Sequence, residues 1–289
     1  MAVIFVRYLP VFLLGFGVLA MILTARPFLI GKEIAQRHAR FKSLRSSSPI
    51  LNGLIAVSVV GKPVLEYFQK NDWNPDILPF GLALPITLTA SASVFALIGC
   101  IVYFFFRAIR NINFFSNAKI RSPYAAFFML VPITNIIVVP YLQYFTLHRS
   151  RLIASPESAS KGRAMALVFA AYALFLTGLV YGRLSDDISQ STAYDPLSLL
   201  VLSLSAGGAG GILTSRVIRS IADAQDACAR GRGLLPLQEC DPKAERRARL
   251  QQLLQSVTVA LLVIVAAATA LFPQLPSTLA AVILQSLGL

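Results

Sequence analysis

Charged side chains are scarce in this sequence, and so are the residues that build most metal and redox sites. Only 13% of the 289 residues are charged, against about 25% in a typical soluble domain, while 56% are hydrophobic. The three cysteines form no CxxC pair, and the two histidines lie far apart in the sequence. The chain therefore lacks the ligand spacing of a zinc site and the pattern of a disulfide framework. We expect no metal, no cofactor and no catalytic constellation.

Acidic residues are the rarer charged type, with 13 Asp and Glu against 26 Lys and Arg. In a soluble protein this excess would suggest nucleic-acid binding, but no recognition module accompanies it. The bases instead lie in short segments between apolar runs, where Lys and Arg orient a membrane protein and face anionic lipid. We therefore expect membrane lipids with anionic headgroups as partners, and no nucleic acid.

Long apolar runs dominate what is present. A helix needs about 20 apolar residues to cross a bilayer. The candidate runs are 2–25, 50–68, 79–106, 123–147, 164–182, 196–215 and 254–272. They predict an all-α, polytopic integral membrane protein that forms a single membrane domain over residues 1–289. The last run begins a C-terminal helix and apolar tail at 254–289.

The run 123–147 conflicts with a simple alternation of sides, because basic residues flank both of its ends. Lys and Arg are held on the cytoplasmic face. If 123–147 crossed the bilayer, its two basic flanks would lie on opposite faces. If it enters and returns on one face, the four basic segments of the chain all become cytoplasmic. We predict about six transmembrane helices plus one Pro-broken re-entrant or hairpin segment at 123–147.

The interior of that segment holds Pro132, Asn135, Pro140 and Tyr141. Proline lacks an amide proton and clashes with the preceding turn, so both prolines are expected to break a helix. Non-helical backbone survives at membrane depth only inside protein or beside water. Asn135 either bonds the backbone groups that the prolines free, or lines a ligand or ion path. Both interpretations remain open.

Two further features of the apolar runs have structural and functional alternatives. Lys62 is costly in a membrane unless it reaches the interface or pairs, and Glu66 lies four residues away on the same helix face. The alternative is a substrate-binding or proton-relay lysine. Gly207 and Gly211 form a GxxxG pair, which is typical of close helix packing.

Segment 26–48 has near-helical apolar spacing and many bases, which predicts an amphipathic helix on the membrane surface. Arg37, Arg40, Lys42 and Arg45 are the predicted contacts to lipid headgroups. A plain basic loop explains the same residues equally well.

The charged loop or helix 216–252 contains Asp223 and Asp226, spaced as DxxD. Two carboxylates at this spacing share a helix face and can hold Mg²⁺ for a diphosphate substrate, as in a lipid-modifying enzyme. The alternative is a helix end whose carboxylates pair with neighbouring arginines.

An ordered set of residues resembles a known pattern: Arg107, Arg110, Asn111, Ser122-Pro123, Phe128, Pro132, Asn135, Pro140-Tyr141 and Arg149, then Arg216, Arg219 and Gln225. In this respect the chain is similar, over roughly residues 50–229, to a bacterial polytopic membrane family catalogued as a domain of unknown function. The family's pattern has an Arg-Asn stretch, an aromatic run, Pro-x-x-Asn and Pro-Tyr. This resemblance implies an architecture for the core at 50–229 and no reaction.

We expect a non-catalytic accessory or scaffolding subunit that packs against other membrane proteins, or against itself, and against lipids. The alternative is a transporter or channel for a small molecule or ion, and a lipid-modifying enzyme is a third hypothesis. A bacterial inner membrane is the favoured location, with a photosynthetic or organelle membrane as the alternative.

Overall fold

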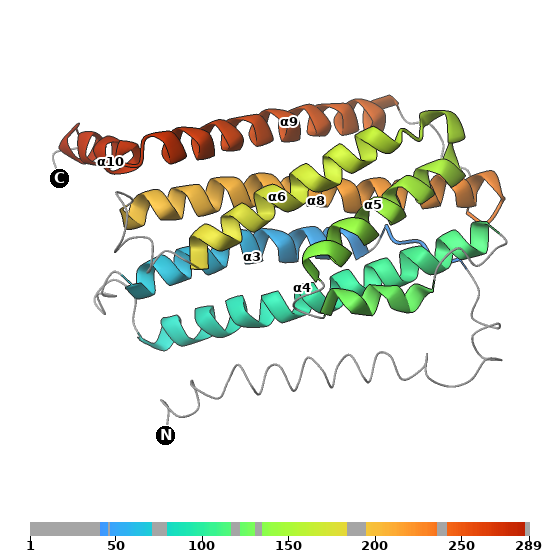
Figure 1. The fold of residues 1–289 in the computed structure, drawn as a ribbon, viewed down its shortest axis with the longest axis horizontal. Helices are drawn as coiled ribbons and strands as arrows, with labels where there is room; N and C mark the ends of the chain where they lie inside the picture. Colours follow the sequence, from blue (N-terminus) through green and yellow to red (C-terminus); the bar gives the residue numbers. More distant parts are fainter. Residues whose placement is uncertain are drawn as a thin grey trace, which may run out of the picture. The chain divides into compact units, whose positions relative to one another are not determined.

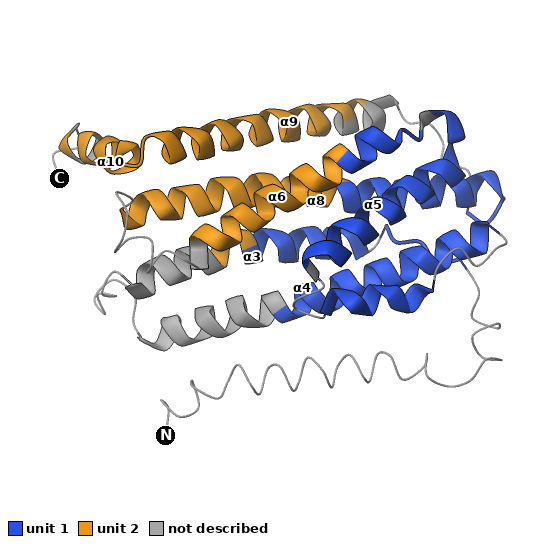
Figure 2. Ribbon diagram, viewed as in Figure 1, with its two compact units in different colours: residues 1–58, 85–165, 217–237 blue, residues 59–84, 166–216, 238–289 orange. Residues whose placement is uncertain are grey.

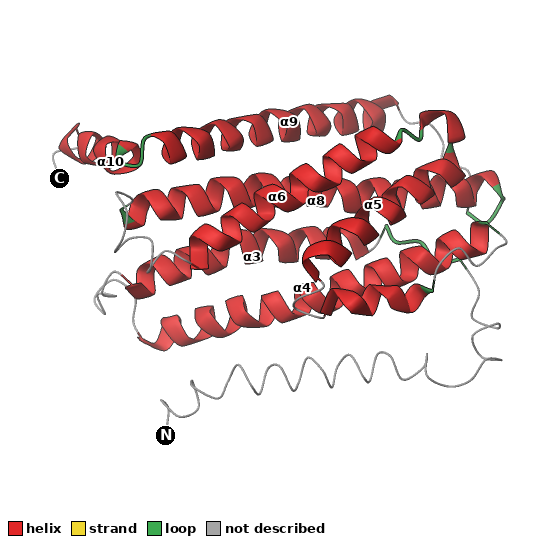
Figure 3. Ribbon diagram, viewed as in Figure 1, coloured by secondary structure: helices red, strands yellow, loops and turns green. Residues whose placement is uncertain are grey.

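The computed structural model describes residues 41–45, 47–70, 80–116, 122–130, 135–183, 195–235 and 242–286. Helices make up nearly all of this part of the chain, and it contains no strand (Figure 3). The all-α prediction is therefore confirmed. The predicted helix 2–25 and residues 26–40 of the predicted interfacial segment lie outside the described residues.

Figure 1 shows the helices in chain order. They are α3 (Ser47–Lys70), α4 (Phe80–Phe115), η1 (Pro123–Leu130), α5 (Asn135–Ala154), η2 (Pro156–Ser158), α6 (Lys161–Arg183), α8 (Pro196–Gly231), α9 (Pro242–Leu271) and α10 (Leu275–Ser286). Four of the described segments are long and apolar enough to cross a membrane: Phe95–Phe115, Lys161–Tyr181, Pro196–Gly231 and Arg249–Leu271. The chain is thus a helical membrane protein, as its composition predicts.

Two helices continue well past the apolar runs that predict them. α4 extends beyond residue 106 to Phe115, and α8 extends beyond residue 215 to Gly231. In both extensions apolar residues recur at helical spacing and are buried, namely Ala108, Ile109, Ile112, Phe115, Val217, Ile218, Ile221 and Ala222. One buried stripe is enough to stabilise a helix whose other face is charged.

α8 ends in a Schellman motif. Gly233 has φ +69°, a conformation that costs little only for glycine. The amide of Gly233 donates to the carbonyl of Arg230 at 3.0 Å, and the amide of Leu234 donates to that of Ala229 at 2.9 Å. The predicted charged segment 216–252 is therefore mostly helix, divided between the end of α8 and the start of α9.

The run 123–147 is divided into η1 and the first part of α5, and residues 131–134 between them lie outside the described part. Pro132 falls in that gap. The prediction that Pro140 breaks the helix is wrong, because α5 runs through it. Pro140 is the sixth residue of α5, so its missing amide proton leaves only the carbonyl of Ile136 without its helical donor, near the helix start.

The chain divides into two compact units (Figure 2). Unit 1 comprises residues 1–58, 85–165 and 217–237, and unit 2 comprises 59–84, 166–216 and 238–289. Unit 1 has an aromatic and aliphatic core of fully buried side chains: Phe104, Phe105, Ile109, Ile112, Leu142, Leu147, Ile218 and Ile221. Unit 2 packs α6 and α9 against the first half of α8.

Candidate functional site

A buried network of side-chain amides joins three helices in unit 1. The side chain of Gln225 on α8 is 1% exposed. Its Nε2 donates to the carbonyl of Ala108 on α4 at 3.1 Å and to Ser150 Oγ on α5 at 3.0 Å. Its Oε1 accepts from Nδ2 of Asn111 on α4 at 2.7 Å. One glutamine thus joins three helices.

Asn111 extends this network to the segment 41–45. Its second Nδ2 proton goes to the carbonyl of Lys42 at 3.0 Å, and its Oδ1 accepts from the amide of Lys42 at 3.5 Å. Both side-chain amides therefore use all their protons inside unit 1. We call Asn111, Gln225, Ser150 and their backbone partners the amide network.

Asp226 binds the same segment next to the amide network. The carboxylate is 3% exposed, and its Oδ2 accepts from Ser43 Oγ at 2.9 Å. The Ser43 hydroxyl oxygen in turn accepts from the amide of Arg45 at 3.2 Å. Buried polar groups usually need such partners, so Ser43 gives Asp226 a structural role in holding segment 41–45.

Asp223, three residues earlier, is exposed and surrounded by positive charge. Arg45, Arg219 and Arg230 act electrostatically on its carboxylate. Three arginines beside a DxxD pair oppose the binding of a further cation. The described residues contain no group of three or more His, Cys, Asp and Glu placed to hold a metal ion. Positive charge thus surrounds Asp223, and the arginine-paired helix end and the magnesium site both stay predictions.

Several arginines of unit 1 bind neighbouring polypeptide rather than a carboxylate. Arg151 donates to Ser220 Oγ from Nε at 3.2 Å and from Nη2 at 2.9 Å, which links α5 to α8. Arg232 Nη2 donates to the carbonyl of Phe115 at 2.6 Å, and its guanidinium lies 5.3 Å from the centre of that phenyl ring. Arg232 therefore satisfies the end of α4, whereas Arg151 joins α5 to the side of α8.

His148 lies on α5 and is 9% exposed. Its imidazole stacks on the ring of Tyr144, with centroids 5.9 Å apart and planes inclined by 5°. Burial lowers the pKa of His148 below its ordinary value, and the positive charges of Lys161 and Arg149 lower it further. The folded protein therefore favours the neutral imidazole.

The structure describes only some of the predicted residues of segment 123–147. Asn135 is the first residue of α5, and its side chain lies outside the described part, so both interpretations of it stay predictions. Pro140 is buried. Tyr141 is 42% exposed and stacks on Phe145 with centroids 6.5 Å apart.

The predicted basic positions are likewise only partly described. Arg37, Arg40 and the side chain of Lys62 lie outside the described part, so their predicted roles are not tested. Lys42 donates from Nζ to the hydroxyl of Tyr103 at 3.3 Å, with Nζ 5.9 Å from the ring centre. Arg45 contributes its amide to the bond with Ser43.

The predicted glycine packing surface lies within unit 2. A Cβ added to Gly178 on α6 would lie 2.6 Å from the Cα of Gly207 on α8, so these backbones touch. Ser203 Oγ also donates to the carbonyl of Gly178 at 2.8 Å. Gly210 makes a second close approach, to the backbone of Phe175, while Gly211 is buried.

α9 has one face against α8, and most of its other positions are exposed among the described residues. On the inner face, Arg216 of α8 donates to the carbonyl of Gln252 at 2.8 Å and to Ser256 Oγ at 2.9 Å. Further along, Ala266 packs with Leu202 and Ala206. Only 6% of the apolar span of α9 is buried, against 61% of that of α8.

Sequence reasoning missed the residues that complete these contacts. Asn111 and Gln225 belong to the family-like pattern, but nothing in the pattern pairs them. Ser43, Ser150 and Gly178 stand in ordinary helix or loop sequence and carry no signal of their own.

Comparison with known proteins assigns neither a family nor a function to the chain. No protein-family model matches the chain, and neither a curated protein nor a solved structure matches it. The resemblance of residues 50–229 to a membrane family of unknown function therefore stays a prediction.

Proposed function

We propose that this protein is a non-catalytic accessory or scaffolding component of a membrane assembly, and that α9 packs against another membrane protein. The supporting observation is the outer face of α9. Large aliphatic side chains are exposed there at Leu250, Leu254, Val257, Leu261, Ile264 and Leu271. The protein packs against lipids elsewhere, in a membrane that we take to be a bacterial inner membrane.

The aliphatic residues of the outer face are regularly spaced, and Leu253, Val263 and Val265 are exposed beside them. The regularly spaced residues follow one another at intervals of four, three, four, three and seven residues, which is the heptad spacing of a helix-packing seam. The less exposed positions, Gln255, Leu262, Ala266 and Thr269, lie on the opposite side and follow a similar spacing. α9 therefore carries two seams, of which α8 occupies one.

Small residues beside the outer seam favour a helix as its partner. Ala260 lies three residues after Val257 and four before Ile264, and Ala267 lies three after Ile264 and four before Leu271, so both share the seam side of the helix. Small side chains let a neighbouring backbone approach, and such close contact drives helix association in a membrane, where burial from water contributes nothing.

Photo-crosslinking in intact membranes tests this proposal. A photoreactive amino acid is introduced singly at positions 257, 260, 261, 263, 264 and 266. We expect protein adducts at Val257, Leu261 and Ile264 and none at the inner position Ala266. If the outer positions gave lipid adducts alone, the protein-packing role of α9 would be wrong.

We also propose the finer topology, with six spanning helices and a re-entrant hairpin formed by η1 and α5. The apolar part of α5, residues 135–147, is about 20 Å long at 1.5 Å per residue. The eight residues of η1 span about 16 Å at 2.0 Å per residue. Each piece is shorter than the hydrocarbon core of about 30 Å, and together they suit a path that enters and returns.

Cysteine labelling tests the hairpin. Single cysteines replace Ser116 and Ser155 in a chain whose Cys100, Cys228 and Cys240 are serine. We expect an impermeant thiol reagent to reach both positions from the same face. Labelling from opposite faces would show that 123–147 crosses the bilayer.

A further inference from the structure

One long stretch of the chain carries positive charge without any carboxylate. Between Asp76 and Glu157 there are six Lys and Arg and no Asp or Glu. Four of these bases lie in described helices: Arg107 and Arg110 on α4, and Arg149 and Arg151 on α5. A surface built from these elements matches an anionic partner by charge.

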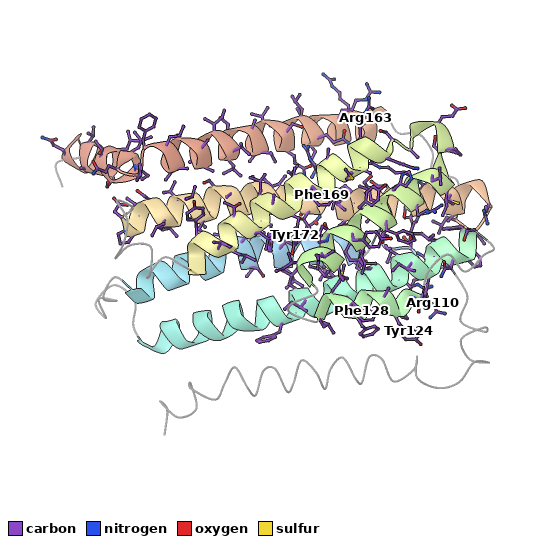
Figure 4. The ribbon with its side chains drawn as sticks, viewed as in Figure 1. Arg110, Tyr124, Phe128, Arg163, Phe169 and Tyr172 are labelled. Carbon is purple, nitrogen blue, oxygen red and sulfur yellow. The ribbon has the colours of Figure 1, made fainter. Side chains whose placement is uncertain are left out.

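The end of α4 and the helix η1 form an aromatic platform beside Arg110, which Figure 4 labels together with Tyr124 and Phe128. The guanidinium of Arg110 lies 5.9 Å from the ring centre of Phe106. Tyr124 meets the same ring edge-on at 5.7 Å and stacks on Phe127 at 6.2 Å. Ring contacts thus fix Tyr124 of η1 in front of the arginine-bearing turn of α4.

The outer side of this platform is amphipathic, with exposed aromatic rings and half-buried arginines. Tyr124 is 49% exposed, and Phe128, four residues later, is 58% exposed. On α4, Tyr103, Arg107 and Arg110 follow at i, i+4 and i+7 and so lie on one face. Tyr103 is 38% exposed.

The platform also lies where the apolar part of α4 ends. Residues 95–106 carry no charge, and Arg107 is the first charged residue of the helix. In a bilayer this transition coincides with the headgroup region, where tyrosines and long basic side chains concentrate. An arginine at this depth can meet a phosphate while a neighbouring aromatic ring meets acyl chain.

We propose that Tyr103, Arg107, Arg110, Tyr124 and Phe128, the α4–η1 patch, bind an anionic glycerophospholipid. The guanidinium groups take the headgroup phosphate, with which arginine forms paired charge-assisted hydrogen bonds. Phe128 and Tyr124 contact the glycerol and the upper acyl chain. The absence of acidic residues from α4 and η1 disfavours the choline cation of a zwitterionic lipid. The proposal rests on the membrane placement in the proposed function and is independent of α9 packing.

Fluorescence quenching by brominated lipids tests this site in the full-length protein. Phe128→Trp is combined with Trp73→Phe, so that one tryptophan reports on the patch. The protein is reconstituted in phosphatidylcholine with either dibrominated phosphatidylglycerol or dibrominated phosphatidylcholine. We expect a local preference for phosphatidylglycerol of about fivefold or more, since each basic residue near an anionic lipid contributes about that factor.

Matched variants separate a specific patch from general membrane charge. Ile264→Trp in the Trp73→Phe chain reports on the lipid next to α9. Ile264 is 62% exposed and lies far in sequence from any base. We therefore expect no preference there, with a ratio of phosphatidylglycerol to phosphatidylcholine near one. Arg107→Gln with Arg110→Gln is expected to reduce the preference at position 128 at least threefold. Arg163→Gln, an exposed base on α6, is expected to leave it unchanged.

Two results would overturn the proposal: equal ratios at positions 128 and 264, or an undiminished preference in the double arginine variant. If the double variant does not fold, Arg110→Gln is compared with Arg110→Lys. The proposal requires that Arg110→Lys retain most of the preference for phosphatidylglycerol at position 128 and that Arg110→Gln lose it. A lack of α9 crosslinks would leave these ratios unchanged, so the two proposals fail separately.

Discussion

Asn111 and Gln225 account for the internal order of unit 1 at the scale of single residues. Their direct bond connects positions 114 residues apart and ties α4 to α8. Buried amides that are fully bonded specify one arrangement of helices, because any shift would leave a donor without its acceptor. The sequence shows both residues as polar positions in helical surroundings, but it contains nothing that pairs them. The amide network was therefore not predictable, although its two central residues stand in the family-like pattern.

Gln225→Leu should destabilise the protein by about 1–3 kcal/mol, because Asn111 and the carbonyl of Ala108 lose a buried partner. Asn111→Leu should cost a similar amount, and the two losses should be less than additive when combined. Equilibrium unfolding in mixed micelles measures all three variants. Thr177→Val is the control, since its exposed hydroxyl bonds only to its own helix. Strict additivity would show that the two amides do not act together.

His148 should make stability fall in mild acid. Its pKa is lowered in the folded protein, so the unfolded chain binds the proton more readily. The stability is fully present above the unfolded pKa of about 6.5 and is lost as pH falls below that value. Wild-type protein should therefore lose more thermal stability between pH 7.5 and pH 5.5 than His148→Asn. An equal loss in both proteins would assign the pH dependence to other groups.

At the scale of elements, apolar runs predict where helices lie and not how far they extend. The runs 79–106 and 196–215 locate α4 and α8. Charge ends the apolar run in both places and leaves 216–252 open as loop or helix, yet buried residues such as Ile112 and Ile221 continue the helical stripe in both extensions. An amphipathic stripe shorter than three turns is a weak signal in a charged segment. In α5 the sequence predicts a helix break at Pro140 that does not occur. Pro140 lies close enough to the start of the helix to be tolerated there.

Gly178→Ala should destabilise the contact between α6 and α8 by about 1–3 kcal/mol, because its Cβ would overlap the backbone of Gly207. Gly53→Ala and Gly99→Ala are matched controls in α3 and α4, since an added Cβ meets nothing within 4 Å at either site. These controls should be neutral or stabilising by up to about 1 kcal/mol from helix propensity. Thermal unfolding of the three variants measures these differences in stability. If Gly178→Ala matched its controls, the close approach of the two helices would be wrong.

Asp195 should stabilise the start of α8 as its N-cap. Its Oδ1 accepts from the amide of Ser198 at 2.6 Å. Burial raises the pKa of this carboxyl, but hydrogen bonds from Ser198 and Ser277 outweigh burial and hold the pKa below its ordinary value. The stability is present above about pH 4 and is lost as pH falls through the folded pKa.

Asp195→Ala should therefore cost about 0.5–2 kcal/mol at neutral pH. Asp195→Asn should keep most of the cap and lose its acid sensitivity. Unfolding curves at pH 7 and pH 4 compare the variants with wild type. If Asp195→Ala were as stable as wild type at pH 7, Asp195 would not stabilise α8 as its N-cap.

At the scale of the whole molecule, helix length sets what a membrane can accommodate. α4 and α8 each have 36 residues, about 54 Å of helix, which exceeds the hydrocarbon core of about 30 Å. Their charged ends must therefore continue beyond the hydrocarbon core, and the amide network joins residues in those ends. Composition predicts the membrane placement, and loop charge predicts which segments share a face. Neither predicts that the outer side of α9 exposes aliphatic residues at heptad spacing.

The mass of the intact particle, extracted from native membranes by a polymer without detergent, tests the proposed packing role most directly. The protein itself has a mass of 31.3 kDa. We predict a particle that contains at least one further polypeptide, and that loses it when Leu261 and Ile264 are both replaced by alanine. A particle that holds a single chain and lipids alone would contradict the account.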